Sequence, residues 1–440
     1  MAAAPGSDIL YPEDSLPFAK SMVAGFQHVI AMFGGTILCP LLMGFDPNVA
    51  ILCSGLSTLL FFVIVRGRIP SYLGSSFSFI AVVIAATGYS GSGPNPNIAI
   101  ALGGILVTGL VYAGIGLLVL LTGTRWIERL MPPALTGAIV AVIGLNLAPV
   151  AVHDMGSGAF EITLGLATVA LMAVSAIYLP AFLARLPILI GGGAAYLLYF
   201  VLCNLGGLGQ PIDFAPVAAA PWIGLPHFVA PVFTVSASLL IAPVAIILVA
   251  ENLGHVRSIG IMMGRNLDPS LGRAFLGDGL ATIFSAAAGG TGVTTYAENM
   301  GVMAITRNFS SRTFLFAALF AVCFGLSPKF GALIQTIPMP IMGGLSLVVF
   351  GLITAAAGRI WVENKVDFTE PRTLIMVGVA VMIAAGDLSL KIGDFVLSGI
   401  GLATLASLAL HHGLNLKTRP KMVTVSYLTT EYTRDIAPPN

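Results

Sequence analysis

The chain has 440 residues, of which 57% are hydrophobic and only 9% charged, with a mean hydropathy of +0.96 and a formal net charge of +1. Soluble globular proteins carry roughly 25% charged residues, so the composition excludes a soluble enzyme or binding domain and indicates a polytopic membrane protein. Residues 1–15 are polar and lack the apolar core of a signal peptide, so we expect no cleavable leader.

The apolar runs divide into fourteen candidate membrane spans, since a helix needs about 20 apolar residues to cross the hydrocarbon core. In chain order they lie at residues 20–43, 48–65, 71–87, 98–121, 134–152, 162–182, 187–204, 232–256, 274–288, 296–306, 311–327, 338–357, 373–386 and 393–413. The third, ninth, tenth and thirteenth are short or interrupted. The expected fold is an all-α polytopic membrane protein.

The distribution of positive charge predicts the orientation. With both termini in the cytoplasm, eighteen of the 20 Lys and Arg residues fall on the cytoplasmic side, and only Lys329 and Lys391 fall on the other. This asymmetry follows the positive-inside rule. We therefore expect a multi-pass protein of the inner or plasma membrane, with a cytoplasmic N-terminus (1–19) and a cytoplasmic tail (414–440).

Two segments of the chain resemble each other. PALTGAIVAVIGL (133–145) and PIMGGLSLVVFGL (340–352) share a Pro, a Gly four residues later, and a Gly-Leu pair seven residues beyond. They belong to the fifth and twelfth spans, and an offset of seven spans makes the two copies enter the membrane from opposite sides. Such an inverted repeat is typical of secondary transporters.

The same offset pairs the interrupted third and tenth spans. SYLGSSFSF (71–79) and GGTGVTTYAEN (289–299) are rich in Gly, Ser and Thr, which disfavour a continuous helix. Non-helical backbone at membrane depth survives only where protein covers it or where it lines a wet cavity. We expect two short antiparallel β segments near the midplane, each leading into a half helix whose N-terminal amides face a polar binding site.

Three acidic residues lie well inside candidate spans: Glu251, Asp278 and Glu298. Each costs about 2.5–3.5 kcal/mol at that depth, so a functional or tightly paired role is expected. The structural alternatives are an ion pair of Glu251 with a neighbouring histidine, an N-cap role for Glu298, and a place at the membrane edge for Asp278.

His255 follows Glu251 by four residues and therefore shares a helix face with it. An acid and an imidazole one turn apart can share or pass a proton, and Asn252 lies beside them. His28, in the first span, is interpreted as packing between helices. Phe77 and Tyr296 flank the two interrupted segments, where they serve either as core residues or as stacking platforms.

These motifs resemble the nucleobase/ascorbate transporter family. ENMGVMAITR (298–307) fits the family signature of an acid or amide followed by Asn, a Gly three residues after the first position, and a Thr-Arg pair. AENLGHV (250–256), YLGSSFSFI (72–80) and QHVIAMFGGT (27–36) are similar to the eighth, third and first spans of that family. The resemblance covers essentially the whole chain and is nearest to the uracil permease and pyrimidine-utilisation permease branch.

The resemblance implies fourteen spans in two inverted groups of seven. A core domain would consist of residues 20–121 and 232–327, which are spans one to four and eight to eleven. A gate domain would consist of residues 134–204 and 338–413, which are spans five to seven and twelve to fourteen. The family also implies a homodimer through the gate domains.

The resemblance also assigns roles to residues by position. Glu251 and Glu298 match the acids that bind the base, and His255 matches the histidine tied to proton coupling. Phe77 matches a residue that contacts the base through its main chain. Two further positions, Tyr296 and Gly35, would line the pocket, and the expected supporting residues are Asn299, Asp278, His28, Asn252 and Phe350. The chain departs from its relatives at Ala297, where Gly is frequent, and at Phe350, where uracil permease has Tyr.

The expected function is proton-coupled import of uracil, or of thymine, by alternating access of the core domain against the gate domain. Uracil offers two N–H donors and two carbonyl acceptors, which suit carboxylates and backbone amides, and such a site rejects analogues that lack these groups. A xanthine or urate permease is the main alternative, since those relatives commonly carry Gln in place of Glu298. An anion exchanger of the same fold would instead need Arg or Ser at the site.

Other classes of function lack support in the sequence. It contains no metal-ligand cluster, no nucleophile-base pair and no continuous polar helix face, so a membrane enzyme or a channel is disfavoured. No basic patch alternates with aromatic residues as in nucleic-acid binders. We expect no metal and no cofactor, and the expected partners are a nucleobase, protons and membrane lipid.

Overall fold

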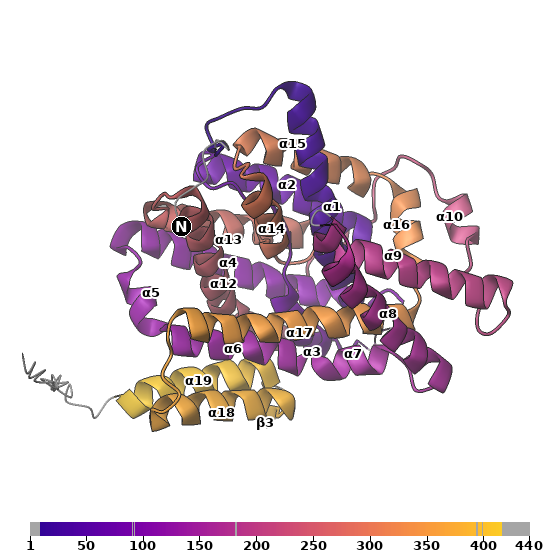
Figure 1. Cartoon of the computed structure of the whole chain (residues 1–440). Coiled ribbons are helices and arrows are strands. Elements are labelled where there is room, and N and C mark those ends of the chain that lie inside the picture. Colours follow the sequence, from indigo (N-terminus) through magenta and orange to yellow (C-terminus); the bar gives the residue numbers. More distant parts are fainter. Residues whose placement is uncertain are drawn as a thin grey trace, which may run out of the picture.

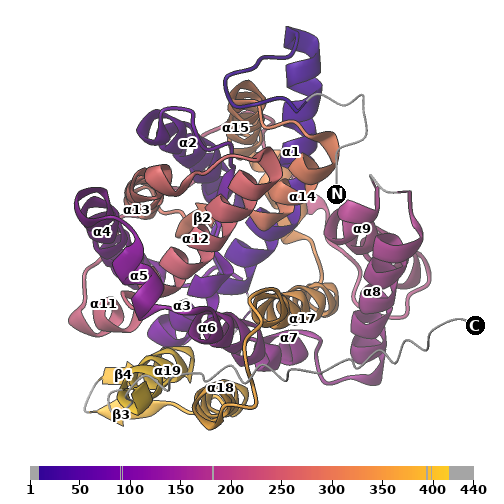
Figure 2. The same ribbon diagram turned by 60° about the vertical axis from the view of Figure 1, so that its left-hand side comes forward.

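The computed structural model describes residues 9–89, 91, 93–180, 183–392, 395–397 and 399–415. Within these residues the chain is mainly helical, and its helices form two groups that pack mostly among themselves (Figures 1 and 2). Residues 1–8 of the predicted N-terminal segment and residues 416–440 of the predicted tail lie outside the described residues.

The first helix group surrounds a short β ribbon and comes from two separate parts of the sequence. Its first part consists of α1 (Phe18–Met43), α2 (Pro47–Val65), β1 (Leu73–Ser75), η1 (Phe77–Phe79), α3 (Ile80–Thr87) and α4 (Ile98–Thr122). Its second part consists of α11 (Val235–Ile241), α12 (Val244–Met263), η4 (Asp268–Ser270), α13 (Leu271–Ala287), β2 (Val293–Thr295), α14 (Ala297–Thr306) and α15 (Ser311–Gly325). Helix α13 packs against α4 and α2, and α15 packs against α1 and α2, so the two parts form one bundle.

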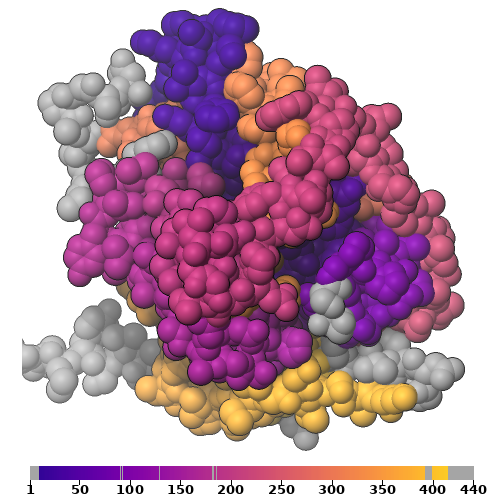
Figure 3. Space-filling model, turned by 90° about the vertical axis from the view of Figure 1, so that its right-hand side faces the viewer, coloured from indigo at the N-terminus to yellow at the C-terminus, as the bar shows by residue number. Residues whose placement is uncertain are grey.

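The second helix group lies beside the first. It consists of α6 (Pro133–Asn146), α7 (Ala148–Asp154), α8 (Ala159–Tyr178), α9 (Pro187–Tyr199), η3 (Phe200–Leu205), α17 (Met339–Glu363), α18 (Pro371–Ala385) and α19 (Gly399–Asn415). Helix α17 packs against α6, α7 and α8, and α18 packs against α6 and α19. The space-filling view shows the magenta and pink middle of the chain between indigo α1 above and the yellow C-terminal helices below (Figure 3).

Short elements connect the longer helices. They are α5 (Arg125–Leu130), η2 (Leu183–Arg185), α10 (Ala215–Ala219) and α16 (Pro328–Gln335). A hairpin of β3 (Leu390–Ile392) and β4 (Phe395–Leu397) precedes α19. The predicted start of the last span at residue 393 was therefore wrong, because the helix begins at Gly399.

The described helices are those of a multi-pass membrane protein. Eight are long and apolar enough to cross a bilayer, and α15 with α16, bent by 78°, would make a ninth. This number counts α6 with α7, α9 with η3, and α11 with α12 as single spans. The predicted spans at 71–87, 373–386 and 393–413 correspond to shorter apolar helices. The membrane architecture is confirmed, and the number of fourteen spans stays a prediction.

Local sequence explains where several helices begin and end. Pro243 separates α11 from α12, because proline has no N–H to continue the helical ladder. Gly44 ends α1 and Gly264 ends α12, both in the left-handed conformation that glycine tolerates. Arg307 ends α14 in the same conformation, with φ of 50°, which is uncommon for a residue with a side chain. Helix α14 is thereby limited to 10 residues.

Candidate functional site

The β1–β2 ribbon lies inside the first helix group. Its strands pair antiparallel, with Leu73 opposite Thr295, Gly74 opposite Thr294 and Ser75 opposite Val293. All six residues are buried. Strand β1 leads into η1 and α3, and β2 leads into α14, so the starts of two short helices lie at opposite ends of the ribbon. Two short antiparallel strands, each leading into a short helix, are the arrangement expected from the sequence.

Two acidic residues lie on helices α12 and α14, which pack against each other next to the ribbon. Glu298 stands in the first turn of α14, and Glu251 lies in the middle of α12. The two carboxyl groups interact electrostatically, and Glu251 also interacts with Ser78 of η1. The Oε2 atom of Glu251 is buried and has no hydrogen-bond partner among the described residues. Together the two side chains offer hydrogen-bond acceptors to a ligand that carries N–H groups.

His255 belongs to a chain of polar contacts that leads away from Glu251. Its Nδ1 atom lies 2.9 Å from Oγ1 of Thr295 on β2, and that hydroxyl donates over 3.5 Å to Oδ1 of Asn252. The amide of Asn252 donates to Asp278 Oδ2 at 2.6 Å and to the Tyr112 hydroxyl at 2.9 Å. If Thr295 donates to Asn252, then His255 Nδ1 carries the proton, and Nε2 is the basic nitrogen.

Asp278 is fully buried in the interior of α13. The alternative that Asp278 starts a helix is therefore wrong. It lies in the middle of α13, which runs from Leu271 to Ala287. Its contact with Asn252 joins α13 to α12. Asp278 and Asn252 thus support the helix that carries Glu251.

Tyr296 fastens the ribbon to α1. Its hydroxyl donates to the Ser75 carbonyl at 2.8 Å and accepts from Thr36 Oγ1 at 3.2 Å. The ring packs against Gly35, where an added Cβ would approach the Tyr296 hydroxyl oxygen to 2.9 Å, and also against Gly74. Tyr296 is 3% exposed, so its ring and its single O–H donor are engaged by the protein in this structure.

Phe77 and Phe350 lie where the two helix groups meet. Phe77 in η1 is half-buried, and its ring contacts that of Phe350 on α17. Ala297, the first residue of α14, is exposed. The contact between the two phenylalanines joins the first helix group to the second.

Asn299 and His28 bind each other. The Asn299 amide lies 2.9 Å from the His28 carbonyl and 3.0 Å from His28 Nδ1, and the His28 ring lies against Phe314 of α15. The interpretation of His28 as packing between helices is in keeping with these contacts. Asn299, expected as a supporting residue of the site, is joined to α1 by its side-chain amide.

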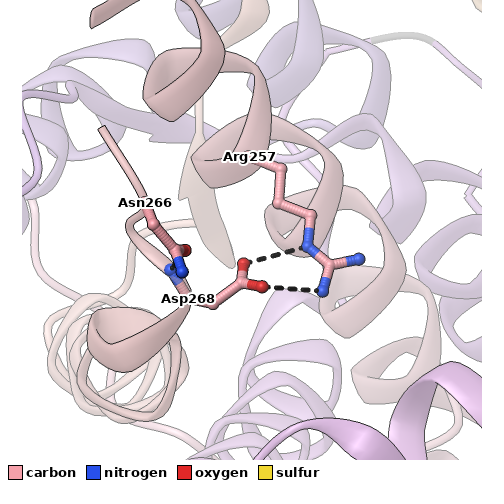
Figure 4. A network of polar contacts seen from close by, with 3 residues as sticks. All are labelled: Arg257, Asn266 and Asp268. Carbon is pink, nitrogen blue, oxygen red and sulfur yellow. Dashed lines mark hydrogen bonds and ion pairs between the residues drawn. The ribbon is translucent and has the colours of Figure 1, made fainter. Parts of the chain in front are cut away.

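The C-terminal end of α12 is tied to the loop before α13. Arg257 donates from Nε and from a terminal nitrogen to the two carboxylate oxygens of Asp268, at 3.0 and 3.1 Å (Figure 4). The Asn266 side chain accepts from the Asp268 main-chain N–H at 2.9 Å. A bidentate pair of this kind fixes direction as well as distance, so it holds α12 in place at Arg257, which lies beyond Glu251 on the same helix.

Comparison with known proteins identifies the family. A permease family model, Xan_ur_permease, matches residues 19–392. The chain belongs to the nucleobase/ascorbate transporter family of permeases. It is 55% identical to the putative pyrimidine permease RutG of Escherichia coli K12, over 93% of each chain. It is 39% identical to the uracil permease of Paenibacillus larvae, over 91% of this chain and 96% of that one.

This membership confirms the family resemblance of the sequence motifs. The relatives are permeases and not enzymes, which confirms that expectation. The chain also shares its fold with solved transporters. The BicA transmembrane domain of a cyanobacterium matches with a TM-score of 0.61 and 16% identity, over 92% of this chain and all of that one. SLC26A9 matches with a TM-score of 0.64 and 10% identity, but the chain spans only 65% of its length.

Sequence reasoning missed several residues of this region. Ser78, Thr295 and Thr36 contact predicted site residues but were passed over, since Ser and Thr are common in membrane helices. Their position within or beside the two interrupted segments was the available signal. Helix rotation, which decides their contacts, cannot be obtained from hydropathy.

Proposed function

We propose that the protein is a proton-coupled symporter that imports a pyrimidine nucleobase, uracil or thymine, across the cell membrane. The observation that carries this proposal is the placement of Glu251 and Glu298 on α12 and α14, two helices that pack against each other beside the ribbon and the starts of two short helices. The relatives named as pyrimidine and uracil permeases support the same substrate class.

In the proposed complex, the base lies between α12, α14 and η1. The carboxylates of Glu251 and Glu298 accept hydrogen bonds from the ring N–H groups, and main-chain N–H groups near Phe77 and Ala297 donate to the carbonyl oxygens. Gly35 acts indirectly, by leaving room for Tyr296. A site with two carboxylate acceptors disfavours anions, so the shared fold with BicA and SLC26A9 does not extend to their cargo.

Proton coupling is assigned to Glu251 and His255. A protonated Glu251 is neutral, and moving a neutral carboxylic acid through a region of low dielectric costs far less than moving a carboxylate. His255 Nε2 is placed one helical turn away to exchange the proton. Each pH unit across the membrane supplies about 1.4 kcal/mol per proton, which drives accumulation.

Alternating access would use the two helix groups as core and gate. The core domain corresponds to residues 20–121 and 232–327, and the gate domain to residues 134–204 and 338–413. Their packing as two groups with few contacts between them supports this division. We also propose the 7+7 inverted repeat, cytoplasmic termini and a homodimer through the gate domains.

Uptake of labelled uracil into proteoliposomes, driven by an acidic outside, tests the proposal. Glu251→Gln should reduce pH-driven accumulation at least about tenfold, because it removes the proton site while keeping one acceptor. Glu363→Gln is the matched control, since Glu363 is exposed and pairs with Arg359 at the end of α17. Normal accumulation by Glu251→Gln would contradict the coupling assignment. Stronger competition by unlabelled xanthine or urate than by uracil would assign the protein to purines.

A further inference from the structure

Among the described residues, the outer edges of the β1–β2 ribbon have no neighbouring strand. In an antiparallel pair, alternate residues direct their N–H and C=O groups away from the partner strand. The Tyr296 N–H donates to the Tyr72 carbonyl, and the Ser76 N–H donates to the Gly292 carbonyl, so these residues bond to the partner strand. By alternation, the main-chain N–H and C=O groups of Leu73 on β1 point away from β2. At membrane depth an unpaired edge is costly, because no water is available to satisfy it.

Side chains of α2 satisfy the outer edge of β1. The Leu73 N–H donates to Thr58 Oγ1 at 3.0 Å, and the Leu73 carbonyl accepts from Ser54 Oγ at 2.6 Å. Thr58 directs its own hydroxyl proton to the Ser54 carbonyl at 2.9 Å. Thr58, Ser54 and Leu73 are all fully buried, so each of these bonds is made without water.

Side chains of α13 do the same for β2. The Val293 N–H donates to Thr282 Oγ1 at 3.3 Å, and Thr282 donates to the Val293 carbonyl at 3.1 Å. Ser285 donates to the Thr291 carbonyl at 2.6 Å. Thr282 and Val293 are fully buried. On each edge, therefore, one threonine of the flanking helix accepts the outward main-chain N–H.

We propose that Thr58 and Thr282 are positioning residues for substrate binding, which replace the missing neighbouring strands and fix the register of the ribbon. The ribbon joins η1, which carries Ser78, to α14, which carries Glu298. Because a slip of one residue reverses the direction of every side chain in a strand, the register decides where these groups lie relative to Glu251. This inference rests on the proposed nucleobase site.

The ordinary role of a buried threonine in a membrane helix is to bond its own helix. Thr168 on α8 shows it: the side chain is fully buried, and its hydroxyl donates to the Leu164 carbonyl one turn earlier at 2.9 Å. Thr58 and Thr282 differ from Thr168 in accepting from a main-chain N–H of another element. Thr168 is therefore the matched control for the same substitution.

The test compares Thr58→Val, Thr282→Val and Thr168→Val, in which valine keeps the shape and removes the hydroxyl. We expect the first two variants to bind uracil at least about tenfold more weakly than the wild type, because each leaves a buried main-chain group unsatisfied. Thr168→Val should bind within about twofold of the wild type. Thr58→Ser and Thr282→Ser keep the hydroxyl and should restore binding.

Hydrogen–deuterium exchange in nanodiscs gives a second readout that needs no substrate. The peptides that contain Leu73 and Val293 should exchange faster in the two valine variants and not in Thr168→Val. If the wild type fails to bind uracil, the proposed function is wrong, and exchange alone decides on the ribbon. If Thr58→Val and Thr282→Val bind uracil and exchange as Thr168→Val does, the inference is overturned. If a valine variant does not fold, the serine variant at the same position should still fold and bind uracil normally. A serine variant that also fails to fold or to bind would overturn the inference.

Discussion

Phe77 and Phe350 meet edge to face where the two helix groups adjoin, with ring centroids 6.4 Å apart and an interplanar angle of 82°. Phe77 begins η1, which is separated from β1 by Ser76 alone, whereas Phe350 lies on the long helix α17 of the second group. Any movement of one group against the other must change this contact. The pair therefore links the conformation of the ribbon to the relative position of the two groups.

Phe350→Leu tests that link by keeping much of the apolar volume and removing the ring edge. Aromatic pairs contribute about 0.5–1.5 kcal/mol beyond area burial, so we expect uracil affinity, measured by calorimetry, to fall by about two- to tenfold. Phe368→Leu is the control, since Phe368 makes a similar contact with Trp361, at 5.2 Å, within one group. Equal losses in the two variants would remove any special role of the Phe77–Phe350 contact.

Gly35→Ala should displace Tyr296. The new methyl group would lie 2.9 Å from the Tyr296 hydroxyl oxygen, closer than carbon and oxygen tolerate, and the bonds of Tyr296 to Ser75 and Thr36 would be strained. We expect a loss of uracil binding of at least about tenfold together with a lower thermal midpoint in detergent. Gly378→Ala is the control, because nothing lies within 4 Å of a Cβ at that position. An unchanged midpoint and affinity in Gly35→Ala would contradict the close packing.

Asn252→Leu should destabilise the protein by removing the 2.6 Å donor of the buried Asp278 carboxyl group. A buried polar group that loses its partner costs about 1–3 kcal/mol, and more if it is charged. Replacing both partners removes that cost, so the double variant Asn252→Leu/Asp278→Leu should be less destabilised than the sum of the two single variants. Thermal unfolding of all three variants in detergent measures this difference. Strict additivity would show that the two side chains act independently.

The N-terminal segment crosses the C-terminal ends of α12 and α14. Leu10 N–H donates to the Arg307 carbonyl at the end of α14, at 3.0 Å. Glu13 accepts from Arg265, just beyond α12, at 2.6 and 3.0 Å. The guanidinium of Arg265 also lies 3.8 Å from the centre of the Tyr11 ring. This segment therefore connects the ends of α12 and α14.

Arg265→Gln should loosen that segment, which hydrogen–deuterium exchange at Leu10 would report. The hydrogen bond from Arg265 holds the pKa of Glu13 below its usual value of 4.5. A lowered pKa in the folded state means that the contact is stabilising above pH 4.5 and is lost as the pH falls through the lowered value. Exchange in the wild type, corrected for its intrinsic pH dependence, should be constant from pH 7 to 5. The ion pair is largely exposed and screened by salt, so its contribution is small. Wild-type exchange at neutral pH in Arg265→Gln would contradict a role for the ion pair.

The sequence predicted the parts of the fold that depend on chain length and composition. Apolar runs became helices at nearly the predicted positions, because a bilayer requires both apolar side chains and satisfied backbone groups. The ribbon was predicted because Gly, Ser and Thr at 71–79 and 289–299 disfavour a helix. Glu251, Asp278 and Glu298 were identified because an ionisable group is costly inside a membrane span and therefore needs a partner or a function.

Contacts that depend on the rotation of helices could not be predicted. Asn299 turned toward His28, and His255 paired with Thr295 and not with its neighbour on the same helix face. In each case the partner lies on another element, distant in sequence. Spacing along one helix says which residues share a face, but packing of several helices decides which surface that face meets.

The shortness of α14 sets the depth at which a ligand would lie. A helix rises about 1.5 Å per residue, so its 10 residues cover about 15 Å, half of the roughly 30 Å hydrocarbon core. With Arg307 at the predicted cytoplasmic surface, Glu298 at the other end lies near the middle of the bilayer. A ligand there would be equally far from both aqueous phases. Each entry or exit path would then have to open through only one leaflet.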